Sequence, residues 1–326
     1  MAKIAIELDQ ALASRAAHGA PGRAHHRILA QGPAWSVSDV MCTSGPQDRP
    51  FEERHSGFSI AIVVAGTFQY RASTPRARTA SELMTPGSLL LGSAGQCFEC
   101  GHEHASGDRC LSFHYSTDYL ERIAADAGLR SPKFYFPVLR LPPVRELTPL
   151  ISRASAGLAN SATAAWEELS LHLAAHTIQL VSGISPAVNS APPSALARIT
   201  RTVRMIERHS SRELGINSLA REARLSPYHF LRTFGVVTGL TPHQYTRRAR
   251  LREAAMRLAS GPTKVLDVAL DSGFGDVSNF NHAFRAEFGI SPRAFRLQSL
   301  PTPASNVHRG HAKTVWKWKL RTFSPG

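Results

Sequence analysis

The same pattern occurs twice in the last third of the sequence, as FLRTFGVVTGLTP at residues 230–242 and as FNHAFRAEFGISP at residues 280–292. Each copy has the form Phe-x3-Phe-x4-Gly-x-(Thr/Ser)-Pro, and the second copy follows the first at a shift of 50 residues. A repeat at one fixed shift predicts that a structural unit has been duplicated.

Each copy predicts a helix with a defined start and a defined end. Two phenylalanines four residues apart fall on one face of a helix, and that face must be buried. Residues that cap, end and restart helices recur at matching positions in both copies, namely Ser226, Gly239, Thr241, Asp276, Gly289 and Ser291. The segment from Thr241 to Ser260 is therefore expected to be one continuous helix that follows the first copy.

A shorter helix is expected before each copy, at residues 217–223 with Asn217 as its cap and at residues 265–270. Turns at residues 224–225 and 272–274 would join each short helix to the phenylalanine-containing helix, which makes two helix-turn-helix units. The helix between the units has about 20 residues and a length of ~30 Å. That length is close to the ~34 Å between successive major-groove openings on one side of B-DNA.

These paired units resemble the DNA-binding domain of the AraC/XylS family of bacterial transcription regulators. The resemblance covers about residues 196–297 and is most specific in DVALDSGFGDVSNFNHAFR at residues 267–285, followed by GISPRAFR at residues 289–296. The family commonly carries a basic residue directly after the second aromatic position, where Arg285 fits and Gly235 does not. We therefore expect the second unit to anchor binding.

The resemblance implies a sequence-specific transcription regulator that activates through contact with RNA polymerase, and no enzymatic activity; the sequence leaves repression open as the alternative. Matching the family pattern residue by residue gives as base-reading residues Tyr228, Arg232, Ser278, Asn279, Asn281 and His282. Arginine can bind guanine and asparagine can bind adenine through paired hydrogen bonds. Phosphate contacts are expected from Arg285, Arg247 and Arg248. For each position, the alternative is a solvated polar side chain that does not touch DNA.

The charge distribution agrees with a polyanionic partner such as double-stranded DNA. Residues 1–194 are neutral overall, residues 195–300 carry +9 and residues 301–326 carry +5, which together give the net charge of +14. Neutralising phosphates with basic side chains releases counterions and favours binding. No segment approaches the ~20 apolar residues that a membrane-spanning helix needs, and the expected location is the cytoplasm, where thiols stay reduced.

The expected fold is multidomain. Short strands from about Trp35 to Tyr115, including residues 58–64 and 87–91, predict a small β-sandwich or barrel. The family resemblance implies that this β-rich part is a cupin-like barrel with following helices. We assign residues 1–184 to a cupin-like effector-sensing and dimerisation domain, 185–194 to a linker rich in proline and serine, and 195–300 to an all-α domain of two helix-turn-helix units joined by a linker helix. Residues 301–326 are expected to form a basic, disordered tail.

A helix is also expected at residues 164–181, with two apolar strips. One strip contains Trp166, Leu169, Leu173 and Leu180, and the other contains Leu171, Ile178 and Val181. One strip could pack on the barrel and the other on a second subunit, and burial of both within the monomer is the alternative; the family resemblance favours a homodimer.

Cysteine and histidine are concentrated between residues 97 and 114. The candidate ligands for zinc or another transition metal are Cys97, Cys100, His102, His104 and Cys110. A hairpin centred on Gly107 would pair His104 with Cys110 and bring the set together. A thiol-based sensor and plain structural residues are the alternatives, and Cys42 is too distant in sequence to be assigned.

Three other classes of protein are weighed against the regulator. A cupin-like metalloenzyme with a DNA-binding appendage predicts turnover by the amino-terminal half, but the sequence has no paired carboxylates, nucleophile elbow or phosphate loop in support of it. A constitutive architectural DNA binder predicts that no effector changes DNA affinity. An Ada-type methyl acceptor has a different arrangement of cysteines.

Overall fold

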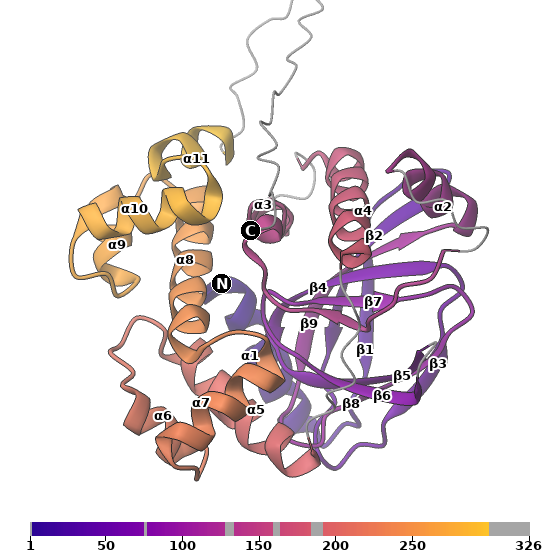
Figure 1. The fold of residues 1–326 in the computed structure, drawn as a ribbon, viewed down its shortest axis with the longest axis horizontal. Coiled ribbons are helices and arrows are strands. Elements are labelled where there is room, and N and C mark those ends of the chain that lie inside the picture. Colours follow the sequence, from indigo (N-terminus) through magenta and orange to yellow (C-terminus); the bar gives the residue numbers. More distant parts are fainter. Residues whose placement is uncertain (1, 75–76, 128–133, 159–163, 184–191, 300–326) are drawn as a thin grey trace, which may run out of the picture.

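The computed structural model describes residues 2–74, 77–127, 134–158, 164–183 and 192–299. A β-rich half comes first and an all-helical half follows it (Figure 1). The elements of the β-rich half are α1 (Ala2–His18), β1 (Ala24–Gln31), β2 (Trp35–Cys42), β3 (Phe51–Arg54), β4 (Phe58–Gly66), β5 (Phe68–Thr74), β6 (Ala77–Met84), β7 (Leu89–Gly92), β8 (Cys97–Gly101), β9 (Asp108–Tyr115), α2 (Thr117–Asp126), β10 (Arg140–Leu141), the 3-10 turn η1 (Arg145–Leu147), α3 (Thr148–Gly157) and α4 (Trp166–Ser182).

Two antiparallel sheets enclose the interior of the β-rich half. One has the strand order β1-β2-β9-β4-β7-β10 and the other the order β3-β8-β5-β6. Along β4, Ala61 and Val63 pack between the sheets with Tyr70, whereas Ile60 and Ile62 pack on the other side. Because both faces of β4 are covered, the strand is an unbroken apolar run and does not alternate with polar residues.

Helices cover the outer face of the six-stranded sheet, with α2 and α4 lying over it in Figure 1. In α4, Trp166 packs its ring 6.3 Å from that of Phe113, measured between centroids. Ile178 and Val181 are also buried in this core, which leaves Leu171 as the exposed member of the second predicted strip. The monomer itself therefore buries most of that strip.

The all-helical half consists of two units with separate cores. Its elements are α5 (Pro193–Arg208), α6 (Ile216–Glu222), α7 (Pro227–Thr238), α8 (Pro242–Ser260), α9 (Val265–Asp271), α10 (Val277–Phe288) and α11 (Pro292–Ser299). Helix α8 supplies Tyr245 and Ala249 to the core formed with α5, α6 and α7, and Leu251 and Leu258 to the core formed with α9, α10 and α11. The predicted helix from Thr241 to Ser260 is confirmed, with Thr241 as its N-cap.

The two halves touch through polar and apolar contacts. Arg140 of β10 donates hydrogen bonds to the carbonyl oxygens of Val237 (2.9 Å) and Thr238 (3.1 Å) at the end of α7, and to Glu82 (2.9 Å). Met256 of α8 packs into the core of the β-rich half. Helix α8 therefore belongs to three hydrophobic cores at once.

The predicted fold class, a β-rich domain with following helices and then an all-α domain of two helix-turn-helix units, is confirmed. Most of the predicted linker at 185–194 and the whole predicted tail at 301–326 lie outside the described residues, although α5 already begins at Pro193. Among the described residues, no helix is both long and apolar enough to cross a membrane.

Candidate DNA-binding surface

Helices α7 and α10, here called the recognition helices, begin and end with the same devices. The side chain of Ser226 accepts a hydrogen bond from the backbone N–H of His229 (3.4 Å), and Asp276 accepts one from that of Asn279 (2.6 Å). Gly239 and Gly289 end the helices with φ angles of 77° and 76°. Glycine adopts this left-handed conformation without the penalty that a side chain imposes.

The paired phenylalanines fix which face of each recognition helix points outward. Phe230, Phe234, Phe280 and Phe284 are all 0% exposed. The ring centroids lie 5.4 Å apart in each pair, and further rings surround them in both cores. Burying one face of a helix leaves the opposite face to solvent or to a partner.

The two units are not copies at a single shift. The hydrogen bond from Leu225 N to Ala220 O (3.0 Å) recurs as the bond from Phe274 N to Ala269 O (3.1 Å), which is a shift of 49 residues. The phenylalanine-containing helices are shifted by 50 residues. One extra residue, Gly275, therefore enters the second turn.

The start of the first short helix differs from the prediction. Helix α6 begins after Gly215, which is its N-cap, and Asn217 lies inside the helix. Proline or a capping side chain marks the starts of the recognition helices, but α6 is only 7 residues long and begins without such a mark. Its position is set by packing of Leu219 and Ala220 into the first core.

All six residues expected to read bases are exposed on the recognition helices, and Tyr228 is 69% exposed. Leu231 lies beside Arg232 and is 44% exposed. At Gly235, where the family pattern expects a basic residue, an added Cβ atom would meet nothing within 4 Å. The surface at this point of α7 is therefore open.

The second recognition helix forms one wall of a surface hollow. Asn281, His282 and Arg285 line it together with Arg293 from the first turn of α11. Arg293 was not among the predicted site residues, although its place directly after Ser291-Pro292 puts it at a helix start next to α10. A basic side chain here can bind a phosphate beside Arg285.

The three arginines expected at phosphates have different surroundings. Arg285 and Arg247 are exposed. Arg248 is not free: its guanidinium forms an ion pair with Glu287 (Nε to Oε1, 3.2 Å) and donates a hydrogen bond to the carbonyl oxygen of Pro143. In this arrangement the contact between the two halves uses the side chain of Arg248, and its role at a phosphate stays a prediction.

Comparison with known proteins agrees with this geometry. Residues 219–298 match a family model described as a helix-turn-helix domain. The HTH-type transcriptional activator RhaS of Klebsiella pneumoniae (strain 342) is 36% identical over 100 residues, which are 31% of this chain and 36% of that protein. RhaS of Salmonella typhimurium (strain LT2) is 32% identical over 153 residues, which are 47% of this chain and 53% of that protein.

The carboxy-terminal region is an AraC/XylS-type helix-turn-helix domain. Among solved structures, the DNA-binding domain of AdpA in complex with a target DNA is 28% identical, covers 31% of this chain and 91% of that chain, and has a TM-score of 0.30. The matches to RhaS span about a third of the Klebsiella protein and about half of the Salmonella protein.

Outside the AraC/XylS-type domain, the cysteine and histidine residues are arranged differently from the prediction. The expected hairpin centred on Gly107 is wrong, because β8 pairs with β3 and β5 in one sheet while β9 pairs with β2 and β4 in the other. Cys97 is exposed at the start of β8, and His104 is half-buried. Cys100 and Cys110 are buried between the sheets. The five predicted ligands therefore do not form one cluster.

The electrostatics of this interior disfavour a thiol-based sensor at Cys100 or Cys110. Burial, together with the nearby Asp108 carboxylate, raises the pKa of both thiols well above the usual value. The thiolate is the reactive form of cysteine, so a raised pKa lowers reactivity. For His102, burial lowers the pKa, but hydrogen bonds to Asp108 and Cys42 outweigh it and raise the pKa to about 10.

Proposed function

We propose that this chain is a sequence-specific DNA-binding transcription regulator that acts as an activator. The observation that carries the proposal is the pair of recognition helices, which are held by buried phenylalanine pairs and expose the side chains expected to read bases. The similarity to RhaS, whose name describes a transcriptional activator, supports it.

The geometry of α8 suits two adjacent major grooves. Its 19 residues give a length of about 28 Å at the rise of an α-helix. The spacing between successive grooves on one side of B-DNA is about 34 Å. In this proposal Arg232 binds guanine, Asn279 or Asn281 binds adenine, and Arg285, Arg247 and Arg293 bind phosphates. The charge of +9 in residues 195–300 attracts the duplex.

The remaining assignments rest on the family resemblance. Residues 1–184 would sense a small molecule or a metal ion and form a homodimer, and residues 185–194 would link them to the DNA-binding domain at 195–300. Activation would involve contact with RNA polymerase at promoters in the cytoplasm. An effector can shift DNA binding only if it binds one arrangement of the chain more tightly than the other.

The test begins with a genome-wide binding map and footprinting to define the operator. Arg232→Ala is then compared with Arg285→Ala on operators that vary one base at a time. We expect Arg232→Ala to cost about 1–3 kcal/mol at one base position, because a base contact carries sequence information. Arg285→Ala should weaken all sequences alike and reduce the salt slope by about one unit, because it removes a phosphate contact.

Two outcomes would contradict the proposal. Footprinting that finds no protected duplex would remove the DNA-binding function itself. An equal and sequence-independent loss in both variants would leave DNA binding intact and refute the division between base-reading and phosphate-binding residues.

A further inference from the structure

Three potential metal ligands meet in the interior of the β-rich half. Cys42 ends β2, Asp108 begins β9, and His102 follows β8 of the opposite sheet. One ligand atom from each residue lies within 4.8 Å of the other two, and the residues are 3%, 5% and 5% exposed respectively. Cys42 and Asp108 are also direct partners in the pairing of β2 with β9, so the sheet holds two of the three ligands in place.

The donor atoms suit a zinc-class ion. His102 Nε2 lies 2.7 Å from Asp108 Oδ1, and the thiol of Cys110 donates a hydrogen bond to Asp108 Oδ2 (3.4 Å). Thiolate, imidazole and carboxylate are the three common protein ligands of Zn²⁺. Bonds of about 2.0–2.3 Å in a tetrahedron place ligand atoms roughly 3.3–3.8 Å apart. The histidine and the carboxylate, now 2.7 Å apart, therefore need to separate by only about 0.6–0.8 Å.

We propose that Cys42, His102 and Asp108 bind one divalent transition-metal ion of the zinc class, with Cys110 bordering the fourth coordination position. These residues are here called the Cys42 site. Of the ligands of the Cys42 site, only His102 was predicted from the sequence, whereas Cys42 and Asp108 were not. The site excludes Cys97, which is exposed at the far end of β8.

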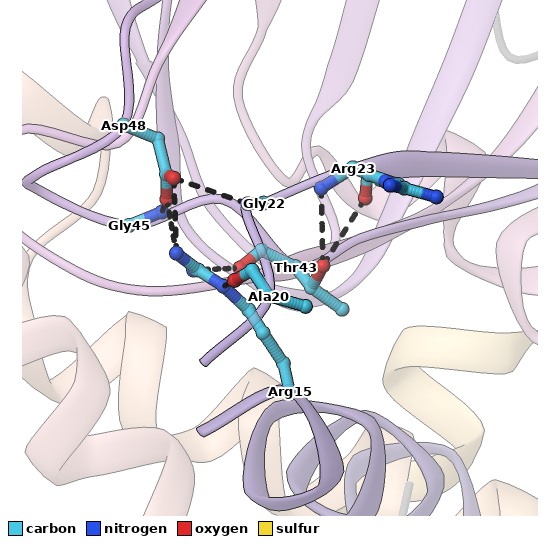
Figure 2. Close-up of polar contacts among 7 residues, drawn as sticks. All are labelled: Arg15, Ala20, Gly22, Arg23, Thr43, Gly45 and Asp48. Carbon is cyan, nitrogen blue, oxygen red and sulfur yellow. Dashed lines mark hydrogen bonds and ion pairs between the residues drawn. The ribbon is translucent and has the colours of Figure 1, made fainter. Parts of the chain in front are cut away.

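The segment that follows Cys42 is held in place by the amino-terminal helix (Figure 2). Arg15 of α1 donates hydrogen bonds to the carbonyl oxygen of Thr43 (2.5 Å) and to Asp48 (2.9 Å). Asp48 in turn accepts a hydrogen bond from the backbone N–H of Gly45 (2.7 Å). Because these bonds fix the chain next to Cys42, the ligand needs little ordering when the ion binds.

The segment that connects two ligands of the Cys42 site contacts the first helix of the DNA-binding domain. Residues 103–107 connect His102 to Asp108, and within them the carbonyl oxygen of Ser106 accepts a hydrogen bond from Arg204 Nη1 of α5 (3.1 Å). An ion that changes the separation of His102 and Asp108 acts directly on this connection. The effect on DNA binding rests on the proposed function, whereas metal binding does not, so the two are measured separately.

The experiment uses the full chain, freed of metal by a chelator under reducing conditions and titrated with CoCl₂ and with ZnCl₂. We expect one equivalent of either ion per chain and, with cobalt, a thiolate-to-cobalt charge-transfer band. Cys42→Ser and Asp108→Asn should each weaken binding at least about 10-fold, since even outer-shell changes cost 10–100-fold. Cys97→Ser and His104→Gln are matched controls from the same cysteine- and histidine-rich segment and should bind as the unaltered chain does.

Two results would overturn the Cys42 site. One is the absence of a stoichiometric ion and of the charge-transfer band in the unaltered chain, a measurement that does not depend on how any variant folds. The other is weakened binding in the controls with unchanged binding in Cys42→Ser, with circular dichroism used to check that each variant is folded. Operator affinity of the metal-free and metal-loaded chain is measured in parallel. A chain that binds metal but no DNA supports the Cys42 site and contradicts the proposed function.

Discussion

Arg140 joins the β-rich half to the first helix-turn-helix unit, and replacing it tests whether that contact holds the two halves together. Its side chain is only 8% exposed, and its guanidinium donates to two carbonyl oxygens at the carboxy-terminal end of α7 and to Glu82. A cation at this end of a helix also opposes the partial negative charge of the helix dipole. Arg140→Ala removes these interactions and leaves the backbone of α7 unaltered.

The expected cost follows from the number of charged hydrogen bonds. A hydrogen bond that involves a charged group contributes about 1.5–3 kcal/mol. The two bonds from Arg140 to Val237 and Thr238 therefore contribute at least about 3 kcal/mol at the lower limit. For domains of this size, 1 kcal/mol lowers the melting temperature by about 2–4 °C, which predicts a decrease of at least about 6 °C.

Differential scanning calorimetry of the full chain measures this effect. Arg153→Ala is the matched control, because Arg153 forms an ion pair with Glu168 (3.2 Å) in which both side chains are largely exposed, at 42% and 54%. Exposed pairs contribute little to stability, so the control should melt within about 2 °C of the unaltered chain. If Arg140→Ala melts like Arg153→Ala, the contact does not hold the halves together and the reasoning fails.

Two further predictions are tested by calorimetry and by unfolding in urea. Gly239→Ala and Gly289→Ala each place a side chain in the left-handed region, which lowers the free energy of unfolding by about 1–2 kcal/mol in each variant. Gly239→Ala should melt lower because its Cβ would lie 2.8 Å from Pro142 Cβ, whereas that of Gly289 meets nothing within 4 Å; equal melting temperatures would refute the close contact. Burial alone would raise the pKa of Asp39, but hydrogen bonds from Arg109 and then Arg27 lower it overall. Its stabilising effect is therefore present above the unfolded pKa of about 3.9 and is lost as the pH falls through the folded pKa. The free energy of unfolding in urea should differ between Asp39→Asn and the unaltered chain at pH 7, and this difference should shrink as the pH falls below about 3.9; a constant difference would contradict this assignment.

Local signals made the all-helical half predictable. Phenylalanines four residues apart, a Ser-Pro start and a terminal glycine each act within one or two turns of helix, and all of them recur in the structure. The N-cap of α6, Gly215, lies two residues before the predicted cap at Asn217, because the position of the helix depends on packing against the first core. The outward face of each recognition helix followed directly from the buried phenylalanines.

Nonlocal contacts explain what could not be predicted. Helix α1 is anchored through Arg15 to a loop at residues 43–48, and no periodicity in its own sequence indicates that contact. The hairpin around Gly107 was wrong because strand pairing is decided across the two sheets. The same cause hid Cys42 and Asp108, which become neighbours only when β2 pairs with β9. The contacts of Arg248 with Pro143, in the loop before η1, and with Glu287 on α10 were hidden for the same reason.

The participation of α8 in three hydrophobic cores has a consequence for how a signal would reach DNA. A rotation of this helix, forced from the β-rich half through Met256, would carry Tyr245 and Leu258 with it and so displace both recognition helices in one motion. Under the proposed function, the two DNA segments contacted by α7 and α10 would then gain or lose affinity together. A promoter that retained only one of these segments would still respond to an effector, with a smaller amplitude.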